Sequence, residues 1–171
     1  MRNDGIRFDY FQNDNQVLTR SGARDAGLSE GDAVFVLGFP LGLVGKGKNF
    51  VIVRQGAIAR IRDCLEAHQK NFLIDCSIFP GNSGGPVIIR PEIAAIEGTK
   101  NLTQASLIGV AAGYVPYRDV AISAQTGNPR ITFEENSGLA SVFPIDYIEE
   151  VIAKAVPKDR PLSTEVSPAS T

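Results

Sequence analysis

Short apolar segments alternate with turn-forming residues along most of the chain. The segments lie at residues 33–38, 51–61, 71–75, 86–90, 105–115 and 138–143. They are rich in valine and isoleucine and are shorter than most helices, which is typical of strands. Glycine, proline, asparagine and aspartate cluster between them and mark turns. The pattern therefore predicts an all-β fold, a small antiparallel barrel of about six strands.

Two of these segments allow more than one interpretation. Gly56 interrupts residues 51–61, which form either two short strands bent at Gln55-Gly56 or one strand with a glycine bulge. Residues 114–137 form a polar insertion before the last strand. Within the insertion we expect residues 120–122 and 131–133 to pair as edge strands.

One α-helix is predicted after the last strand. Pro144 suits a first helical turn, and Asp146, Glu149 and Glu150 favour the positive end of the helix. Apolar residues then recur at helical spacing. We expect this face to pack on the barrel; it consists of Ile145, Ile148, Val151, Ile152 and Ala155.

The two ends of the chain differ from the middle. Residues 1–32 are polar and irregular, with a short strand expected at residues 6–11 and a helical turn at 23–27. Residues 157–171 are rich in proline, serine and threonine and have no periodic apolar pattern, so we expect them to be disordered. The expected barrel domain is residues 33–156.

Length and charge limit the function. The 171 residues amount to one ordinary domain. The net charge of −2 gives no electrostatic case for binding nucleic acid or an anionic membrane. No apolar run approaches the roughly 20 residues that span a bilayer, and the first residues do not read as a signal peptide. Two cysteines, Cys64 and Cys76, are too few for a disulfide framework, so we expect both thiols to be reduced and the protein to be cytoplasmic. We expect neither a cofactor nor a metal ion.

A glycine-rich loop around Ser83 carries the clearest chemistry. Gly81 to Gly85 fit G-x-S-x-G, the nucleophile elbow of α/β-hydrolases, but that elbow passes from a strand into a helix. Here Pro86 and a β-branched run follow, which predicts a strand. Glycines let such a loop curl until consecutive N–H groups point at one spot beside the serine, as an oxyanion hole requires. The alternative is a turn whose serine only caps a backbone group.

A second glycine-rich segment, residues 42–49, nearly matches the phosphate loop G-x-x-x-x-G-K-[ST]. Asn49 replaces the hydroxyl that would hold Mg²⁺. Residues 50–53 also predict a strand where a phosphate loop needs a helix N-terminus. We therefore interpret this segment as a basic hairpin tip with Lys46 and Lys48 in solvent.

The run Gly81-Asn82-Ser83-Gly84-Gly85-Pro86 resembles the nucleophile loop of chymotrypsin-fold serine proteases. With the order of the strands around it, residues 31–155 are similar to the second barrel of trypsin-like, HtrA-like members of that family. The resemblance implies a six-stranded antiparallel Greek-key barrel with a C-terminal helix. Residues 1–32 would then connect it to a first barrel absent from this chain.

The resemblance also implies roles for individual residues. Ser83 would be the nucleophile that forms an acyl-enzyme, and the loop Gly81-Asn82-Ser83 would form the oxyanion hole through the N–H groups of Gly81 and Ser83. Ser77 stands where trypsins carry a carboxylate, so we expect a preference for neutral or small apolar side chains. The expected walls of the specificity pocket are Ser77, Ile78, Phe79, Pro80, Ala112, Gly113, Tyr114 and Gly138.

Unlike the family, this chain has no residue in the expected position of the general base. In this family the histidine and aspartate of the triad come from the first barrel, and the single histidine here, His68, lies in a polar turn. Without a base Ser83 is a weak nucleophile. We therefore expect a serine endopeptidase half that is inactive alone, whose partners are a peptide substrate and a barrel carrying the histidine and aspartate.

Two further hypotheses remain. One is a catalytically dead module that accepts an extended peptide along the strand at residues 105–114. The other is a homo-oligomer formed through apolar barrel surface that the absent barrel would have covered.

Overall fold

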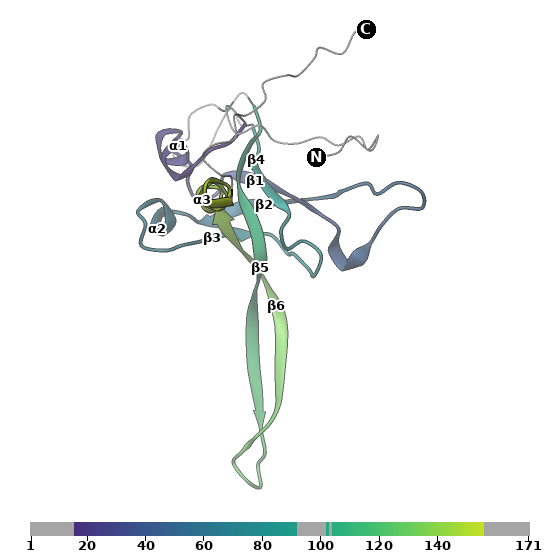
Figure 1. The fold of residues 1–171 in the computed structure, drawn as a ribbon. Coiled ribbons are helices and arrows are strands. Elements are labelled where there is room, and N and C mark those ends of the chain that lie inside the picture. Colours follow the sequence, from purple (N-terminus) through teal and green to yellow (C-terminus); the bar gives the residue numbers. More distant parts are fainter. Residues whose placement is uncertain (1–15, 92–101, 103, 156–171) are drawn as a thin grey trace, which may run out of the picture.

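A closed antiparallel barrel forms the body of the molecule (Figure 1). The computed structural model describes residues 16–91, 102 and 104–155. Neighbouring strands follow the order β1-β2-β3-β6-β5-β4, and the barrel closes where β1 pairs with β4. The strands are β1 (Ala33–Gly38), β2 (Ile52–Arg60), β3 (Phe72–Asp75), β4 (Pro86–Ile89), β5 (Ser106–Ile122) and β6 (Pro129–Pro144).

The order β3-β6-β5-β4 is a Greek key, because three hairpin-connected strands are followed in space by the strand that precedes them in sequence. The predicted six-stranded Greek-key barrel is thus confirmed. The β3–β4 connection contains the loop around Ser83. Among the described residues, three helices and a short 3-10 turn surround the strands: α1 (Arg20–Asp25), η1 (Pro40–Gly42), α2 (Arg62–Leu65) and α3 (Asp146–Ala155). None of the helices within the described ranges is long and apolar enough to span a bilayer.

The barrel interior is aliphatic. In β1 the burial alternates, with Val34 and Val36 fully inside and the residues between them half-buried. The alternation follows from the pleat, which sends successive side chains to opposite faces. The other five strands also contribute to the interior, with residues that include Ile58, Ile74, Val87, Ile108 and Val142.

Segment β2 is one strand, not two. Its register with β3 shifts between Ile58 and Arg60, so the irregularity lies beyond Gly56. Gly56 instead permits close approach of β3, because a Cβ at this position would lie 2.4 Å from the carbonyl oxygen of Asp75.

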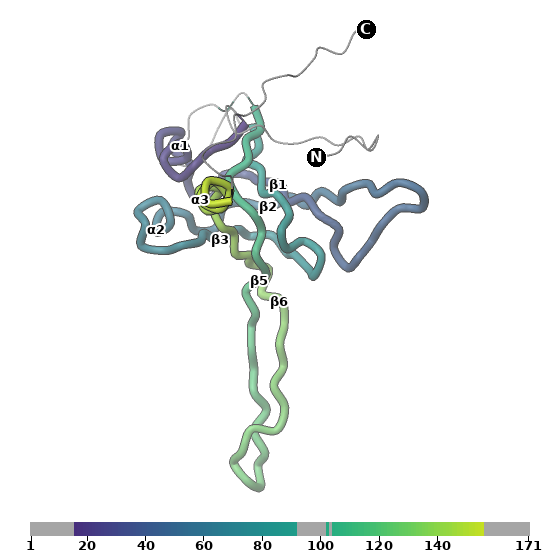
Figure 2. The backbone as a smooth tube through the Cα atoms, viewed as in Figure 1, coloured from purple at the N-terminus to yellow at the C-terminus, as the bar shows by residue number. Residues whose placement is uncertain are grey.

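Strands β5 and β6 are much longer than the barrel. The expected pairing of residues 120–122 with 131–133 is confirmed, for example by Val120 opposite Thr132. These residues are not separate edge strands, however, but the ends of β5 and β6. The two strands leave the barrel together as a hairpin that projects into solvent (Figure 2).

The segment before β1 packs on the barrel. Leu18 N–H donates to Leu107 O at 2.9 Å, and Ala23 and Leu28 are buried in the core. The α1 helix covers residues 23–25 of the predicted turn at 23–27 and begins three residues earlier. Arg20, at its start, contacts Asp146 of α3 through both its backbone N–H and its guanidinium.

The prediction that the apolar face of α3 packs on the barrel is wrong for most of the helix. Ile145, just before the helix, is buried, and Ile148 is half-buried. Val151 and Ile152 remain 64% and 52% exposed, so no described residue covers the apolar face beyond the first turn of the helix. The strand expected at residues 6–11 and the tail at 157–171 lie outside the described residues.

Candidate active site

The loop after β3 is held in one shape by a tight turn. Asn82 N–H donates to Phe79 O at 2.9 Å, which closes a turn with Pro80 and Gly81 at its centre. Gly81 has φ +99°, which suits the third position of a type II turn and disfavours residues with a Cβ. Leu41 N–H donates to Pro80 O at 2.7 Å and ties the turn to the end of β1.

Asn82 anchors this turn from inside. Its side chain is fully buried, and its Oδ1 accepts the N–H of Phe79 at 3.1 Å. Its Nδ2 has no hydrogen-bond partner among the described residues. Gly38 makes room for it, because a Cβ there would lie 2.8 Å from Nδ2.

Ser83 follows Asn82 and is exposed. The chain beyond it is fastened to β5, since Gly84 N–H donates to Ala111 O at 2.8 Å and Ala111 N–H donates to Gly85 O at 2.9 Å. The N–H groups of Gly81 and Ser83 donate to no acceptor in the described part of the chain, whereas that of Asn82 is used in the turn. Two unused backbone donors therefore flank an exposed hydroxyl.

Two hollows meet at Ser83. The smaller has a volume of about 240 Å³ and is lined by Ile78, Phe79, Pro80, Ser83, Gly113 and Tyr114. The larger, of about 790 Å³, lies between the end of β1 and the start of β4. Its walls include Leu37, Phe39, Val51 and Pro86.

The family model of the trypsin-like peptidase domain matches residues 12–91, which include the loop around Ser83. No curated protein matches the chain. The matched stretch contains β1 to β4, and β5 and β6 complete the closed six-stranded barrel of that fold. The matched stretch and the closed barrel are consistent with the C-terminal barrel of the trypsin-like peptidase fold.

Not every residue predicted to form the specificity pocket lines the small pocket. Ser77 and Ala112 are exposed, and neither they nor Gly138 are among its lining residues. Ser77 Oγ lies 3.9 Å from the position of a Cβ on Gly138, so these two residues face each other. Behind the wall, the guanidinium of Arg54 lies 5.4 Å from the ring centre of Phe79, within cation–π range.

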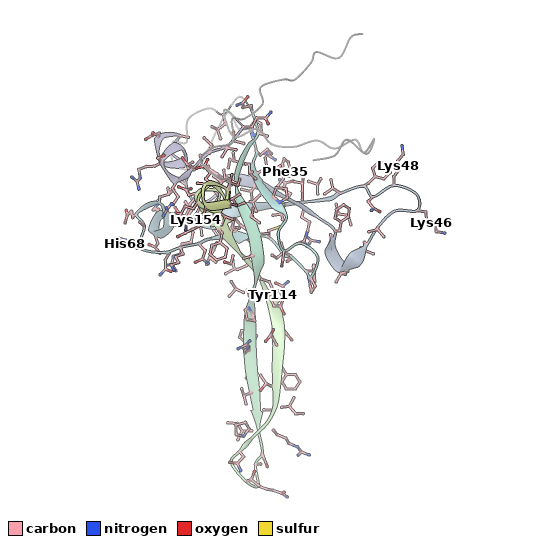
Figure 3. The ribbon with its side chains drawn as sticks, viewed as in Figure 1. Phe35, Lys46, Lys48, His68, Tyr114 and Lys154 are labelled. Carbon is pink, nitrogen blue, oxygen red and sulfur yellow. The ribbon has the colours of Figure 1, made fainter. Side chains whose placement is uncertain are left out.

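Two contacts of the pocket wall were not predicted from the sequence. Asn136 Nδ2 donates to Ile78 O at 2.6 Å, while its Oδ1 accepts the N–H of Gly138 at 2.9 Å. Tyr114 donates its hydroxyl to Glu134 at 3.0 Å, and this contact raises the pKa of Tyr114. Figure 3 places Tyr114 where the hairpin leaves the barrel. Both contacts join residues of the polar insertion to the site, and no short sequence motif predicts either of them.

The single histidine of the sequence lies away from the loop around Ser83. His68 is exposed between α2 and β3, with Nδ1 3.3 Å from Glu66 (Figure 3). The strand β3 separates it from the loop around Ser83, which follows the other end of that strand. The prediction of an exposed turn histidine agrees with this position.

Other candidate chemistry also has a plain structural account. Residues 43–51 lead into strand β2, so the near match to a phosphate loop has no helix N-terminus behind it. Cys64 and Cys76 are free and buried, and burial raises the pKa of both thiols. Across the described ranges no three histidine, cysteine or acidic side chains gather as a metal site would require.

Proposed function

We propose that this chain is the nucleophile-bearing half of a serine endopeptidase. The observation that supports this best is Ser83, exposed at the meeting point of two hollows and flanked by the unused N–H groups of Gly81 and Ser83. Exposed backbone donors beside a hydroxyl are what acyl transfer needs. If Ser83 only capped a backbone group in a turn, the free N–H groups of Gly81 and Ser83 would have no function.

In the proposed reaction Ser83 Oγ bonds to the carbonyl carbon of a peptide, and the carbonyl electrons move to the oxygen. The N–H groups of Gly81 and Ser83 donate to this oxyanion. The serine proton passes to a base and from there to the departing amine, leaving an acyl-enzyme. Water then attacks the ester by the same steps in reverse and releases the acid.

The base must come from outside this chain, because its single histidine lies away from Ser83. The larger hollow is the surface on which a second barrel carrying histidine and aspartate would pack. Its walls are largely apolar, and the adjoining loop exposes Leu41, Leu43, Val44 and Phe50. Apolar surface of this extent is typical of a covered interface.

The small pocket supports a preference for neutral side chains. Its lining residues carry no charged group, and Gly113 and Pro80 leave its mouth open to a small or medium apolar side chain. We expect substrates with such a residue on the acyl side of the cleaved bond, rather than arginine or lysine.

Imidazole in solution can replace the missing base in a test. We expect a fluorophosphonate probe to label the isolated chain slowly, and labelling to rise in proportion to the concentration of unprotonated imidazole. Ser83→Ala should remain unlabelled at every concentration. Fast labelling without imidazole would show that the chain contains its own base, and would contradict the proposal of an inactive half.

A peptide-binding module without catalysis is the second candidate, favoured by the distance between the one histidine and Ser83. In that case imidazole would not accelerate labelling, and Ser83→Ala would bind peptides along β5 as the wild type does.

A further inference from the structure

The part of the β5–β6 hairpin beyond the barrel lacks the support that strands normally have. From Pro116 and Asn136 to the tip it consists of two strands, and Tyr117, Ile122, Ile131 and Phe133 on it are exposed. A two-stranded hairpin in water is marginally stable at best, and a third or fourth strand changes that. A partner for the hairpin is therefore expected on physical grounds.

The two outer edges of the hairpin are not equivalent. On β5, Pro116 has no N–H to offer, and the N–H of Val120 is capped by its neighbour Asp119 at 2.8 Å. A proline and an inward-turned charge are common protections of an exposed edge. The edge of β6 has neither feature between Ile131 and Glu134, and its β-bulge lies at Arg130. In the barrel this same edge is covered by β3, but that pairing begins only at Leu139.

The amide directions on β6 follow from this capping. Because the N–H of Val120 points to Asp119, Val120 and Thr132 form a non-hydrogen-bonded pair. The N–H and C=O of Thr132 then point to the outer edge of β6. By alternation along the strand, so do those of Glu134. At Arg130 the alternation is interrupted by a β-bulge, since Ala121 pairs with Ile131 and Ile122 pairs with Pro129.

The side chains on this edge are self-complementary about Thr132. The sequence is Arg130-Ile131-Thr132-Phe133-Glu134, with opposite charges two residues on either side of Thr132 and an apolar residue next to it on each side. We propose that β6 pairs with β6 of a second copy of this chain, antiparallel and centred on Thr132. The result is a four-stranded sheet in the order β5-β6-β6-β5.

This register satisfies every cross-strand position. Arg130 lies opposite the partner's Glu134, Ile131 lies opposite the partner's Phe133, and the two Thr132 residues meet on the two-fold axis. Opposite charges and apolar pairs in these positions both stabilise a sheet. The contact is isologous, as in most homodimers. A shift by two residues loses these pairs, because it places Arg130 opposite the partner's Thr132 or Ile131 opposite the partner's Glu135.

The proposed pairing of Arg130 with Glu134 between copies extends an ion pair that already exists within one copy. Arg118 Nε lies 2.8 Å from Glu134, on the same face of the hairpin. In the dimer the partner's Arg130 approaches Glu134 from its other side, so one carboxylate lies between two cations. On the opposite face Ile131, Phe133 and their counterparts form one apolar stripe; within each copy Ala121 lies opposite Ile131 and Asp119 lies opposite Phe133.

Oligomeric state and a matched pair of proline variants test this proposal. Analytical ultracentrifugation of the full chain should show a reversible dimer. Thr132→Pro removes an outward N–H from β6 and should raise the dimer dissociation constant by at least about tenfold. Val120→Pro, directly opposite on the other edge, should leave it unchanged. A monomeric wild type, or a dimer that withstands Thr132→Pro, would overturn the proposal, since the second result requires a different face.

Charge reversal provides a second test that needs no proline. Arg130→Glu and Glu134→Arg each place like charges across the two-fold axis, so each variant alone should be monomeric. Mixed in equal amounts they should form a heterodimer, in which both cross-strand pairs are again opposite in sign. A mixture that stays monomeric, with both variants folded by circular dichroism, would contradict the register.

Discussion

Asn82→Asp exchanges one amide nitrogen for an oxygen at the centre of the nucleophile loop. Asn82 is 0% exposed, and its Oδ1 accepts the N–H of Phe79 at 3.1 Å. Its Nδ2 has no partner among the described residues, so an aspartate would place its second oxygen at a fully buried position that makes no hydrogen bond in this structure. Desolvation should therefore hold the pKa of the introduced carboxyl well above its ordinary value.

The sign and size of the effect follow from proton linkage. Below about pH 3.9, the ordinary aspartate pKa, both folded and unfolded chains hold the proton, so the variant should unfold with nearly the wild-type free energy. At higher pH the unfolded chain releases the proton while the folded chain keeps it. The free energy of unfolding then falls by about 1.4 kcal/mol per pH unit. For a folded pKa near 7 the loss at neutral pH is about 4 kcal/mol, a large part of the stability of an ordinary domain.

Urea unfolding followed by circular dichroism between about pH 4 and pH 8 measures this dependence. Ser77→Asp is the matched control, because Ser77 lies in the same connection but is exposed, and its profile should follow the wild type. An Asn82→Asp profile parallel to the wild type would show that water or a cation already reaches residue 82. The loop would then not be the rigid support that the site requires.

Three further predictions concern other parts of the site. Gly56→Ala should lower the free energy of unfolding by about 2 kcal/mol in urea titrations, because its Cβ would lie 2.4 Å from Asp75 O, whereas Gly113→Ala has open space and should be neutral. Asn136→Ala removes two hydrogen bonds around Ile78 and Gly138 and should cost about 1–3 kcal/mol by the same assay; no change would mean that water replaces them. Burial raises the pKa of both cysteine thiols, so a chromogenic thiol reagent should modify them only as fast as the chain opens, and immediate reaction at neutral pH would contradict their burial.

The barrel was predictable because each strand is a short β-branched segment bounded by turn residues. The same reasoning failed where the answer depended on distant partners. The spacing of apolar residues such as Val151 and Ile152 predicts that the helix has an apolar face. It does not predict whether another surface packs on that face, and no described residue covers Val151 or Ile152. Residues 114–137 looked like a polar insertion because a hairpin exposed on both faces has no clean alternation.

The nucleophile loop was predictable from six consecutive residues, since glycine and proline fix its backbone locally. Its supports were not. Asn136 lies far from Ile78 in sequence, and only the pairing of β5 with β6 brings its amide to that carbonyl. The buried environment of Asn82 likewise depends on Gly38, which belongs to another strand.

A crystal structure of the chain after reaction with a peptide boronate or a fluorophosphonate tests the central claim most directly. We expect a tetrahedral adduct on Ser83 Oγ, with its charged oxygen within hydrogen-bond distance of the N–H groups of Gly81 and Ser83, and its side chain in the pocket between Phe79 and Gly113. An adduct whose oxygen points to solvent, with those two amides bonded elsewhere, would contradict the account.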